Sequence, residues 1–268
     1  MGELDGRVAL VTGAGRLRGI GRATAVGLAA MGADVVVTGT GRDPVTFPED
    51  EQRQGWRDVE STAEQVRAHG RRALSWVGDI SQATEVQRLV DHTMQTFGRI
   101  DVLVNNAAYP RGHDRVPVPE LDEAVWHQVL EIKLTGSFLL CKRIVPMMIQ
   151  QQWGRIINLS SVFGKQGGAN TAAYCTANFG IQGFTQALAL EVARHGITVN
   201  AVCPGTVDTA RMDGLGRGET WQQTVESIPM GRPASDEDIT GLIAFLCSSA
   251  AAYMTGQSIN INGGLVMW

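Results

Sequence analysis

The chain has 268 residues and a formal net charge of −4; 44% of its residues are hydrophobic and 19% are charged. This composition supports a buried core and excludes a disordered chain, and an acidic balance without a Lys/Arg run argues against nucleic acid or an anionic membrane as the main partner. Glycine is enriched, at 32 residues or about 12% against a usual ~7%, but without the three-residue period of collagen.

Short apolar runs rich in β-branched residues alternate with longer segments of helical character. The runs are 8–11, 34–38, 73–77, 101–104, 155–159, 198–202 and 258–261, and the helical segments are 20–32, 57–69, 82–97, 120–150, 172–195 and 235–249. Near-continuous apolarity is typical of strands covered on both faces, so the pattern predicts one mostly parallel sheet with helical crossovers. Without a linker or an internal repeat, we expect a single α/β domain over 1–268.

Two connections are unusual. Residues 39–56 form a long mixed-charge link where about 2–6 residues would be ordinary. Residues 205–228 combine glycines with Met and Trp side chains, which favours a mobile lid over a site, although a plain surface loop has the same composition. The four cysteines lie far apart, the histidines show no metal spacing, and no apolar run reaches 18 residues, so we expect a cytoplasmic protein with reduced thiols and without metal.

A glycine-rich turn follows the first apolar run: Thr12-Gly13-Ala14-Gly15-Arg16-Leu17-Arg18-Gly19-Ile20-Gly21 leads into an Ala-rich helical segment. A strand, a glycine turn and a helix start together place backbone N–H groups and the positive end of the helix where a pyrophosphate can bind. The sequence therefore predicts a dinucleotide site at this turn.

Further motifs occur at family-specific spacing. Asn105-Asn106-Ala107-Ala108, Ser160-Ser161, Tyr174 and Pro204-Gly205-Thr206-Val207-Asp208-Thr209 follow the glycine turn, and the chain ends with Gly256 and Asn262-Gly263-Gly264. As a set, over nearly the whole chain, they resemble the short-chain dehydrogenase/reductase family. The resemblance implies a Rossmann-type doubly wound domain with seven strands in the order 3-2-1-4-5-6-7, a nicotinamide cofactor, and a homotetramer or homodimer. The glycine turn is two residues longer than is usual in the family.

The resemblance also implies a set of cofactor-binding positions. They are Gly13, Gly15, Arg16, Arg18, Gly19, Ile20, Gly21, Arg42, Asp79, Ile80, Asn105, Ala107, Tyr174, Pro204, Gly205, Val207 and Thr209. Two of the arginines, Arg18 and Arg42, favour the 2′-phosphate of NADP(H) over NAD(H), because no carboxylate ends the second apolar run. Asp43 is the counter-argument, since a bent loop could bring it to the ribose. Asp79 could equally be a helix cap and Asn105 a link between strands.

The catalytic residues implied by the resemblance are Tyr174, as acid and base, and Ser161, which holds the substrate oxygen. The family also has a Lys four residues after the Tyr, where this chain has Asn178, and an Asn where this chain has Lys133. The two residue types have exchanged places, so we predict a transposed set of Lys133, Ser161, Tyr174 and Asn178. The alternative is that Lys133 reaches solvent and that the chain is a weak enzyme.

Apolar and aromatic residues at Tyr109, Phe163, Met212, Leu215 and Trp221 are candidates for the substrate pocket, although each could belong to the core. The sequence favours an oxidoreductase that transfers a hydride between NADP(H) and a ketone or secondary alcohol. Two alternatives stay open, a reductase of cyclic imines and an inactive nucleotide-binding regulator.

Overall fold

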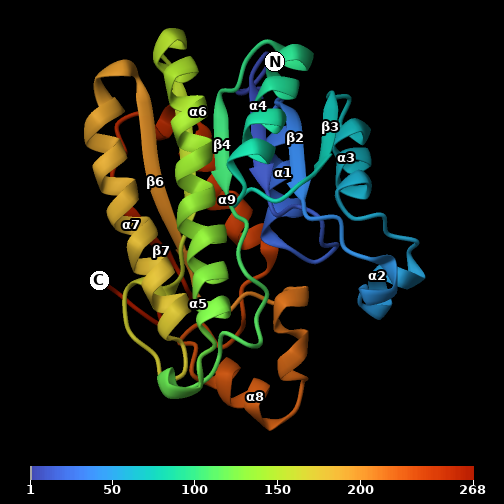
Figure 1. The fold of residues 1–268 in the computed structure, drawn as a ribbon, viewed down its shortest axis with the longest axis vertical. Coiled ribbons are helices and arrows are strands. Elements are labelled where there is room, and N and C mark those ends of the chain that lie inside the picture. Colours follow the sequence, from blue (N-terminus) through green and yellow to red (C-terminus); the bar gives the residue numbers. More distant parts are fainter. Residues whose placement is uncertain (1) are drawn as a thin grey trace.

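Seven parallel strands form one sheet in the order β3-β2-β1-β4-β5-β6-β7 in the computed structural model, which describes residues 2–268 (Figure 1). The strands are β1 (Val8–Thr12), β2 (Asp34–Gly39), β3 (Ala73–Val77), β4 (Val102–Asn105), β5 (Gly154–Leu159), β6 (Ile197–Pro204) and β7 (Ser258–Ile261). The predicted strands and their order are confirmed. The sheet is the doubly wound, Rossmann-type arrangement, and the order of its strands reverses beside β1 and β4, where ligands bind such sheets.

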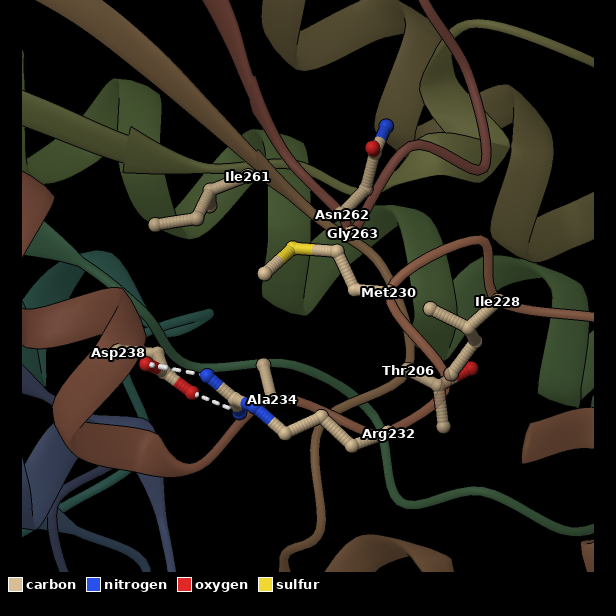
Figure 2. A pocket seen from close by; sticks show the side chains of 9 residues that line it. All are labelled: Thr206, Ile228, Met230, Arg232, Ala234, Asp238, Ile261, Asn262 and Gly263. Carbon is tan, nitrogen blue, oxygen red and sulfur yellow. Dashed lines mark hydrogen bonds and ion pairs between the residues drawn. The ribbon is translucent and has the colours of Figure 1, made fainter. Parts of the chain in front are cut away.

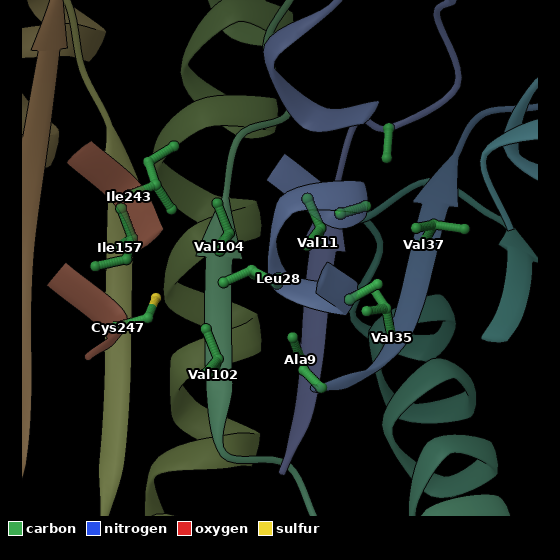
Figure 3. Close-up of a cluster of buried hydrophobic side chains, with 14 of the residues drawn as sticks. Ala9, Val11, Leu28, Val35, Val37, Val102, Val104, Ile157, Ile243 and Cys247 are labelled. Carbon is green, nitrogen blue, oxygen red and sulfur yellow. The ribbon is translucent and has the colours of Figure 1, made fainter. Parts of the chain in front are cut away.

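Helices cover both faces of the sheet. The helices α1 (Ile20–Ala30), α3 (Val59–Ala68) and α9 (Asp236–Cys247) pack on one face, and α4 (Ala83–Phe97), α6 (Gly136–Gln151) and α7 (Ala172–Val192) pack on the other. Each strand sends alternate side chains to the two layers: Ala9 and Val11 meet Leu28 and Ile243 in one core (Figure 3), whereas Leu10 belongs to the other. Burial on both faces explains the runs of consecutive apolar residues in β1, β2 and β4.

The predicted helix over 120–150 is wrong in detail. It consists of α5 (Glu123–Leu130), one π-helical turn (Glu131–Thr135) and α6. A π turn inserts one extra residue per turn and re-aims the side chains around it. Lys133 lies within this turn and is buried.

Two segments expected as loops contain helices. The connection after β2 carries α2 (Glu49–Arg53), and the segment after β6 carries a 3-10 helix (Ala210–Leu215) and α8 (Glu219–Glu226). In Figure 1, α8 lies at the end of the molecule away from the N-terminus. Across residues 2–268, no helix is both long enough and apolar enough to cross a membrane.

Candidate active site

The glycine turn has the geometry that the sequence predicts. Gly13 has φ +67°, and a Cβ atom there would approach Ala107 Cα to 2.9 Å. A Cβ at Gly21 would lie 2.5 Å from the carbonyl oxygen of Gly13, so the start of α1 can rest directly on the turn. Helix α1 begins after Gly19 without a side-chain cap. The N–H groups of its first turn are therefore placed to meet an anionic ligand.

The side chains of Thr12 and Asn106 fix the position of this turn. Thr12 Oγ1 accepts hydrogen bonds from the N–H groups of Asn106 and Ala107, both at 3.0 Å. The amide of Asn106 in turn donates to the carbonyl oxygens of Thr12 and Gly13, at 2.8 and 3.0 Å. The loops after β1 and β4 are thus held together at the switch point of the sheet.

The long connection after β2 packs onto the same glycine turn. Trp56 Nε1 donates to the carbonyl oxygen of Gly15 at 2.6 Å, and Leu17 N donates to the buried carboxylate of Glu51 at 2.9 Å. Asp58, at φ +53°, lies against Gly15 so closely that a Cβ on Gly15 would fall 1.4 Å from its Oδ1. The glycine turn, which is two residues longer than is usual in the family, therefore packs against the connection after β2, which is also unusually long.

The two arginines predicted to bind the adenosine end of the cofactor already form ion pairs within the protein. Arg18 binds Asp50 on α2 at 2.6 Å and Asp213 in the 3-10 helix at 2.5 Å. Arg42 binds Glu51 at 2.8 Å and donates to the carbonyl oxygen of Gly15 at 2.8 Å. Both guanidinium groups thus have carboxylate partners that the sequence analysis did not foresee.

Arg16 differs from these two arginines, because no ion pair to it is found within residues 2–268. Burial lowers the pKa of Arg16, and the nearby positive charge of Arg42 lowers it further, while Glu51 and Asp58 act in the opposite direction. A half-buried guanidinium without a direct carboxylate partner remains available to a phosphate.

Several other predicted cofactor positions have structural contacts of their own. The amide of Asn105 donates to Asn158 Oδ1 at 2.8 Å, which ties β4 to β5. Asp79 Oδ1 accepts from the N–H and the hydroxyl of Ser81, at 2.9 and 2.8 Å, and so holds the turn before α4. Ile80 is buried against Gly136. The linking role considered for Asn105 is therefore present in the structure, whereas Asp79 is not the N-cap of α4, because Gln82 holds that position.

The segment that follows β6 is held on two sides. Pro204 ends β6, and Gly205 N donates to the carbonyl oxygen of Ile261 at 3.1 Å; a Cβ on Gly205 would approach Asn262 to 2.9 Å. Val207 then pairs with Ala234 in a single parallel bridge. Only glycine fits at position 205, so the backbone passes close to the end of the sheet there.

Ser161 and Tyr174 both contact Phe163, in the 3-10 turn that follows β5. Ser161 caps a 3-10 turn (Val162–Gly164), and its Oγ accepts a hydrogen bond from Phe163 N at 3.2 Å. The Phe163 ring meets the Tyr174 ring edge to face with centroids 6.1 Å apart. Since the Ser161 hydroxyl accepts this bond, its own proton is left to donate to a substrate oxygen.

Lys133 lies in the π-helical turn before α6, and Asn178 lies on α7. Lys133 Nζ donates to the carbonyl oxygen of Leu159 at 2.5 Å, and burial lowers the pKa of Lys133 to about 7, with a further contribution from the positive charge of Arg211. Asn178 Nδ2 donates to the carbonyl oxygen of Tyr174 at 2.8 Å. Asn178 Oδ1 is buried without a hydrogen-bond partner among the described residues.

Sequence reasoning missed two residues at this site, Arg115 and Arg211. The guanidinium carbon of Arg115 lies 3.9 Å from the centroid of the Tyr174 ring, and that of Arg211 lies 5.5 Å from it. Arg115 belongs to the loop between β4 and α5, and Arg211 belongs to the segment after β6. No spacing or motif marks either residue, and only their position relative to Tyr174 identifies them.

The residues predicted to bind the substrate differ in their position relative to Tyr174 and Arg211. Phe163 touches Tyr174, and the carbonyl oxygen of Tyr109 accepts from Arg211 at 2.5 Å. Trp221 is buried on α8 under the guanidinium of Arg217, 4.2 Å away. Met212 and Leu215 lie in the 3-10 helix beside Arg211.

A separate hollow lies by the ends of β6 and β7 (Figure 2). It is lined by Thr206, Ile228, Met230, Arg232, Ala234, Asp238, Ile261, Asn262 and Gly263. Thr206 stands between two predicted cofactor residues, so the hollow adjoins that loop, but no predicted catalytic residue lines it.

Comparisons with known proteins agree with this architecture. The family described as enoyl-(acyl carrier protein) reductase matches residues 13–266. The chain is 38% identical over 269 residues to a 3-oxoacyl-[acyl-carrier-protein] reductase of Synechocystis, covering all of both chains, and 38% identical over 265 residues to one of Aquifex aeolicus, covering 98% of each. The chain belongs to the short-chain dehydrogenase/reductase family. It is an oxidoreductase of that family.

A solved structure gives the same result for the fold. A protein of Sinorhizobium meliloti described as a short-chain alcohol dehydrogenase superposes with a TM-score of 0.86 at 35% identity, over 98% of this chain and 97% of the other. The seven-stranded sheet of this chain is therefore that of the family. Within residues 2–268, the free acceptor of Asn178 and the N–H groups at the start of α1 fit a dinucleotide, although Asp236 Oδ2 already accepts from the N–H of Gly19 at 3.1 Å.

Proposed function

We propose that the protein reduces a ketone, or oxidises the corresponding secondary alcohol, with NADP(H). The observation that carries this proposal is that Ser161 and Tyr174 both contact Phe163 after the end of β5, Ser161 through a hydrogen bond from the Phe163 N–H group and Tyr174 through its ring. The relatives described above, named for the reduction of 3-oxoacyl groups, support a carbonyl substrate. No contact in the structure favours an imine substrate or a purely regulatory role.

In this mechanism the substrate carbonyl oxygen lies between two hydroxyl groups. The bound nicotinamide cofactor supplies or accepts the hydride. The hydroxyl of Ser161 donates a hydrogen bond to the carbonyl oxygen, and Tyr174 gives its phenolic proton to the same oxygen as negative charge develops there. Phe163 keeps the Tyr174 ring in place through their edge-to-face contact.

Lys133 and Asn178 divide the work that one Lys performs elsewhere in the family. A positive charge about 5 Å from a phenolate, at an effective dielectric of about 20, is worth about 3 kcal/mol or roughly two pKa units. Lys133, whose Nζ is bound two residues before Ser161, would supply this charge when protonated. The free Oδ1 of Asn178 would accept a hydrogen bond from a ribose hydroxyl of the cofactor.

The preference for NADP(H) would depend on Arg16 more than on Arg18 or Arg42, because the other two have carboxylate partners. Binding of NADPH and NADH is measured by fluorescence titration with the wild type and with Arg16→Gln. We expect NADPH to bind more tightly and the variant to lose most of that difference. Tighter binding of NADH by the wild type would contradict the assignment.

Turnover is tested by following the oxidation of NADPH against a panel of ketones, aldehydes and cyclic imines. Tyr174→Phe should lower kcat about 100-fold or more, because it removes the proton donor while leaving the ring contacts. Lys133→Asn with Asn178→Lys restores the family arrangement, and the double change should be milder than either single change. Unaltered kinetics in a Lys133→Ala variant would refute the role of Lys133.

We also propose that residues 205–228 close over the substrate and that the chain forms a homodimer or homotetramer. Arg18 already ties the glycine turn to Asp213 in this segment, which supports a lid that moves with the cofactor site.

The oligomer is supported by exposed apolar side chains that a partner subunit would cover, which are Phe138 on α6 and Phe179 and Leu190 on α7. Analytical ultracentrifugation of the wild type and of a Leu190→Glu variant, which measures the mass of the particle in solution, tests the proposed homodimer or homotetramer.

A further inference from the structure

Two arginines without adequate carboxylate partners face the ring of Tyr174. Within residues 2–268 Arg115 has one ion pair, a long one of 3.7 Å to Asp114, and Arg211 has none. Arg18 and Arg42, at the glycine turn, are paired more closely. The positive charge beside Tyr174 is thus left largely without compensation, in a protein whose net charge is −4.

Several N–H groups of these arginines are also unused. Nε and Nη1 of Arg115 and Nη2 of Arg211 are buried without a hydrogen-bond partner among the described residues. Leaving a buried charged donor unpaired costs free energy, because the group has lost its hydrogen bonds to water without a replacement. A ligand that supplies acceptor oxygens at this point would recover that cost.

The two groups act on each other and on Lys133. Burial lowers the pKa of Arg115, and the positive charges of Arg211 and Arg111 lower it further, whereas Asp114 and Tyr174 act in the opposite direction. Arg211 similarly contributes to the lowered pKa of Lys133. Like charges held together in a partly buried site favour the entry of an anion.

The site receives its arginines from the two segments that border the predicted substrate pocket. Arg115 comes from the loop between β4 and α5, and Arg211 comes from the segment after β6, where its Nη1 donates to the carbonyl oxygen of Tyr109 at 2.5 Å. A planar guanidinium group matches a carboxylate through two parallel hydrogen bonds. We propose that Arg115 and Arg211 bind a carboxylate of the substrate, so that the preferred substrate is a keto acid whose carboxylate lies a few bonds from the carbonyl.

This inference rests on the proposed ketone reduction and is tested with matched substrates. The 2-oxo, 3-oxo and 4-oxo derivatives of a short alkanoic acid are each compared with their methyl esters, by kcat/KM in the presence of NADPH. We expect at least one acid to exceed its ester about 10-fold or more, since a charge-assisted hydrogen bond is worth about 1.5–3 kcal/mol and every 1.4 kcal/mol is tenfold. A kcat/KM for the ester that equals or exceeds the kcat/KM for the acid in every pair would overturn the proposal.

The two arginines are then changed singly. Arg115→Gln and Arg211→Gln should each lower kcat/KM for the acid about 10- to 100-fold, mainly through KM, and should change the ester about threefold or less. Arg88→Gln, an exposed arginine on α4, is the matched control. If acid and ester fall equally and the pH profile moves, the arginines position or activate Tyr174 and the proposal is wrong.

Binding measurements separate this inference from the proposed activity. The hydroxy acid and its methyl ester are titrated calorimetrically into the protein saturated with NADP⁺. Binding of the acid that both arginine variants lose supports the anion site, even if no ketone is reduced. Equal binding of acid and ester overturns it, as does an Arg211→Gln variant that loses affinity for NADP⁺ while keeping its preference for the acid, because Arg211 would then contact the cofactor.

Discussion

Buried Lys133 predicts that the stability of the protein depends on pH. Burial lowers the pKa of Lys133 from 10.5 to about 7. In the unfolded chain the pKa returns to about 10.4. Between these two values the unfolded state binds a proton that the native state lacks, so the free energy of unfolding rises with pH from about 7 to about 10.

The size of the effect follows from the shift. At 1.36 kcal/mol for each pKa unit, a shift of about 3.5 units means that burying the charged ammonium costs about 5 kcal/mol. Below about pH 7 both states are protonated and the native state carries this whole cost. Lys133→Met should therefore stabilise the protein by up to about 5 kcal/mol near pH 6. Near pH 10 the gain should vanish, leaving the loss of the bond to Leu159, about 1 kcal/mol.

Urea unfolding at several pH values between about 6 and 10 tests this reasoning. The comparison is between the wild type and Lys133→Met, with Lys142→Met on the exposed side of α6 as the baseline for losing a lysine. If the difference in the free energy of unfolding between the wild type and Lys133→Met stays constant over this pH range, burial does not lower the pKa of Lys133 and the reasoning is refuted.

Three further substitutions test the scaffold of the site. Gly15→Ala places a Cβ 1.4 Å from Asp58 Oδ1 and should lower the free energy of unfolding by about 1–3 kcal/mol and weaken binding of the dinucleotide. Thermal unfolding and cofactor titration measure the two effects. Adding Asp58→Ala to the variant should recover part of both losses. Asp101→Asn weakens a fully buried carboxylate that two arginines and a backbone N–H bind, and should lower the free energy of unfolding by about 3–5 kcal/mol in a urea titration. Ser235→Ala breaks the capping box with Asp238 at the start of α9 and should cost about 1 kcal/mol by the same measurement; no loss of stability would show that the box is dispensable.

The sequence by itself determined the sheet and most of its helices. Residues in β1, β2 and β5 are buried at nearly every position because both faces are covered, and the apolar runs that this burial favours can be read from the sequence. The glycine turn could also be found from the sequence, since the strand, the turn and the start of the helix follow one another directly, although the contact that requires Gly13 is with Ala107 after β4. The capping box at Ser235 belongs to the same class of short-range signals.

The connection after β2 shows where sequence reasoning ended. Its length was evident, but its contacts with Gly15 and Leu17 join residues more than thirty positions apart. The π turn around Lys133 was also invisible, because an apolar helical pattern continues on both sides of it. Neither a long link nor a periodic pattern specifies which distant backbone it will meet.

The charges of the site were decided only by the tertiary structure. Arg18 seemed free along the chain, yet its carboxylate partners are 32 and 195 residues away. Arg115 and Arg211 carry no motif, and they face Tyr174 only because two loops meet at the same edge of the sheet. Backbone structure is set largely by neighbours in the sequence, whereas the pairing of a long charged side chain is set by the groups that the fold brings within its reach. The glycine turn could therefore be found from the sequence, and the arginines beside Tyr174 could not.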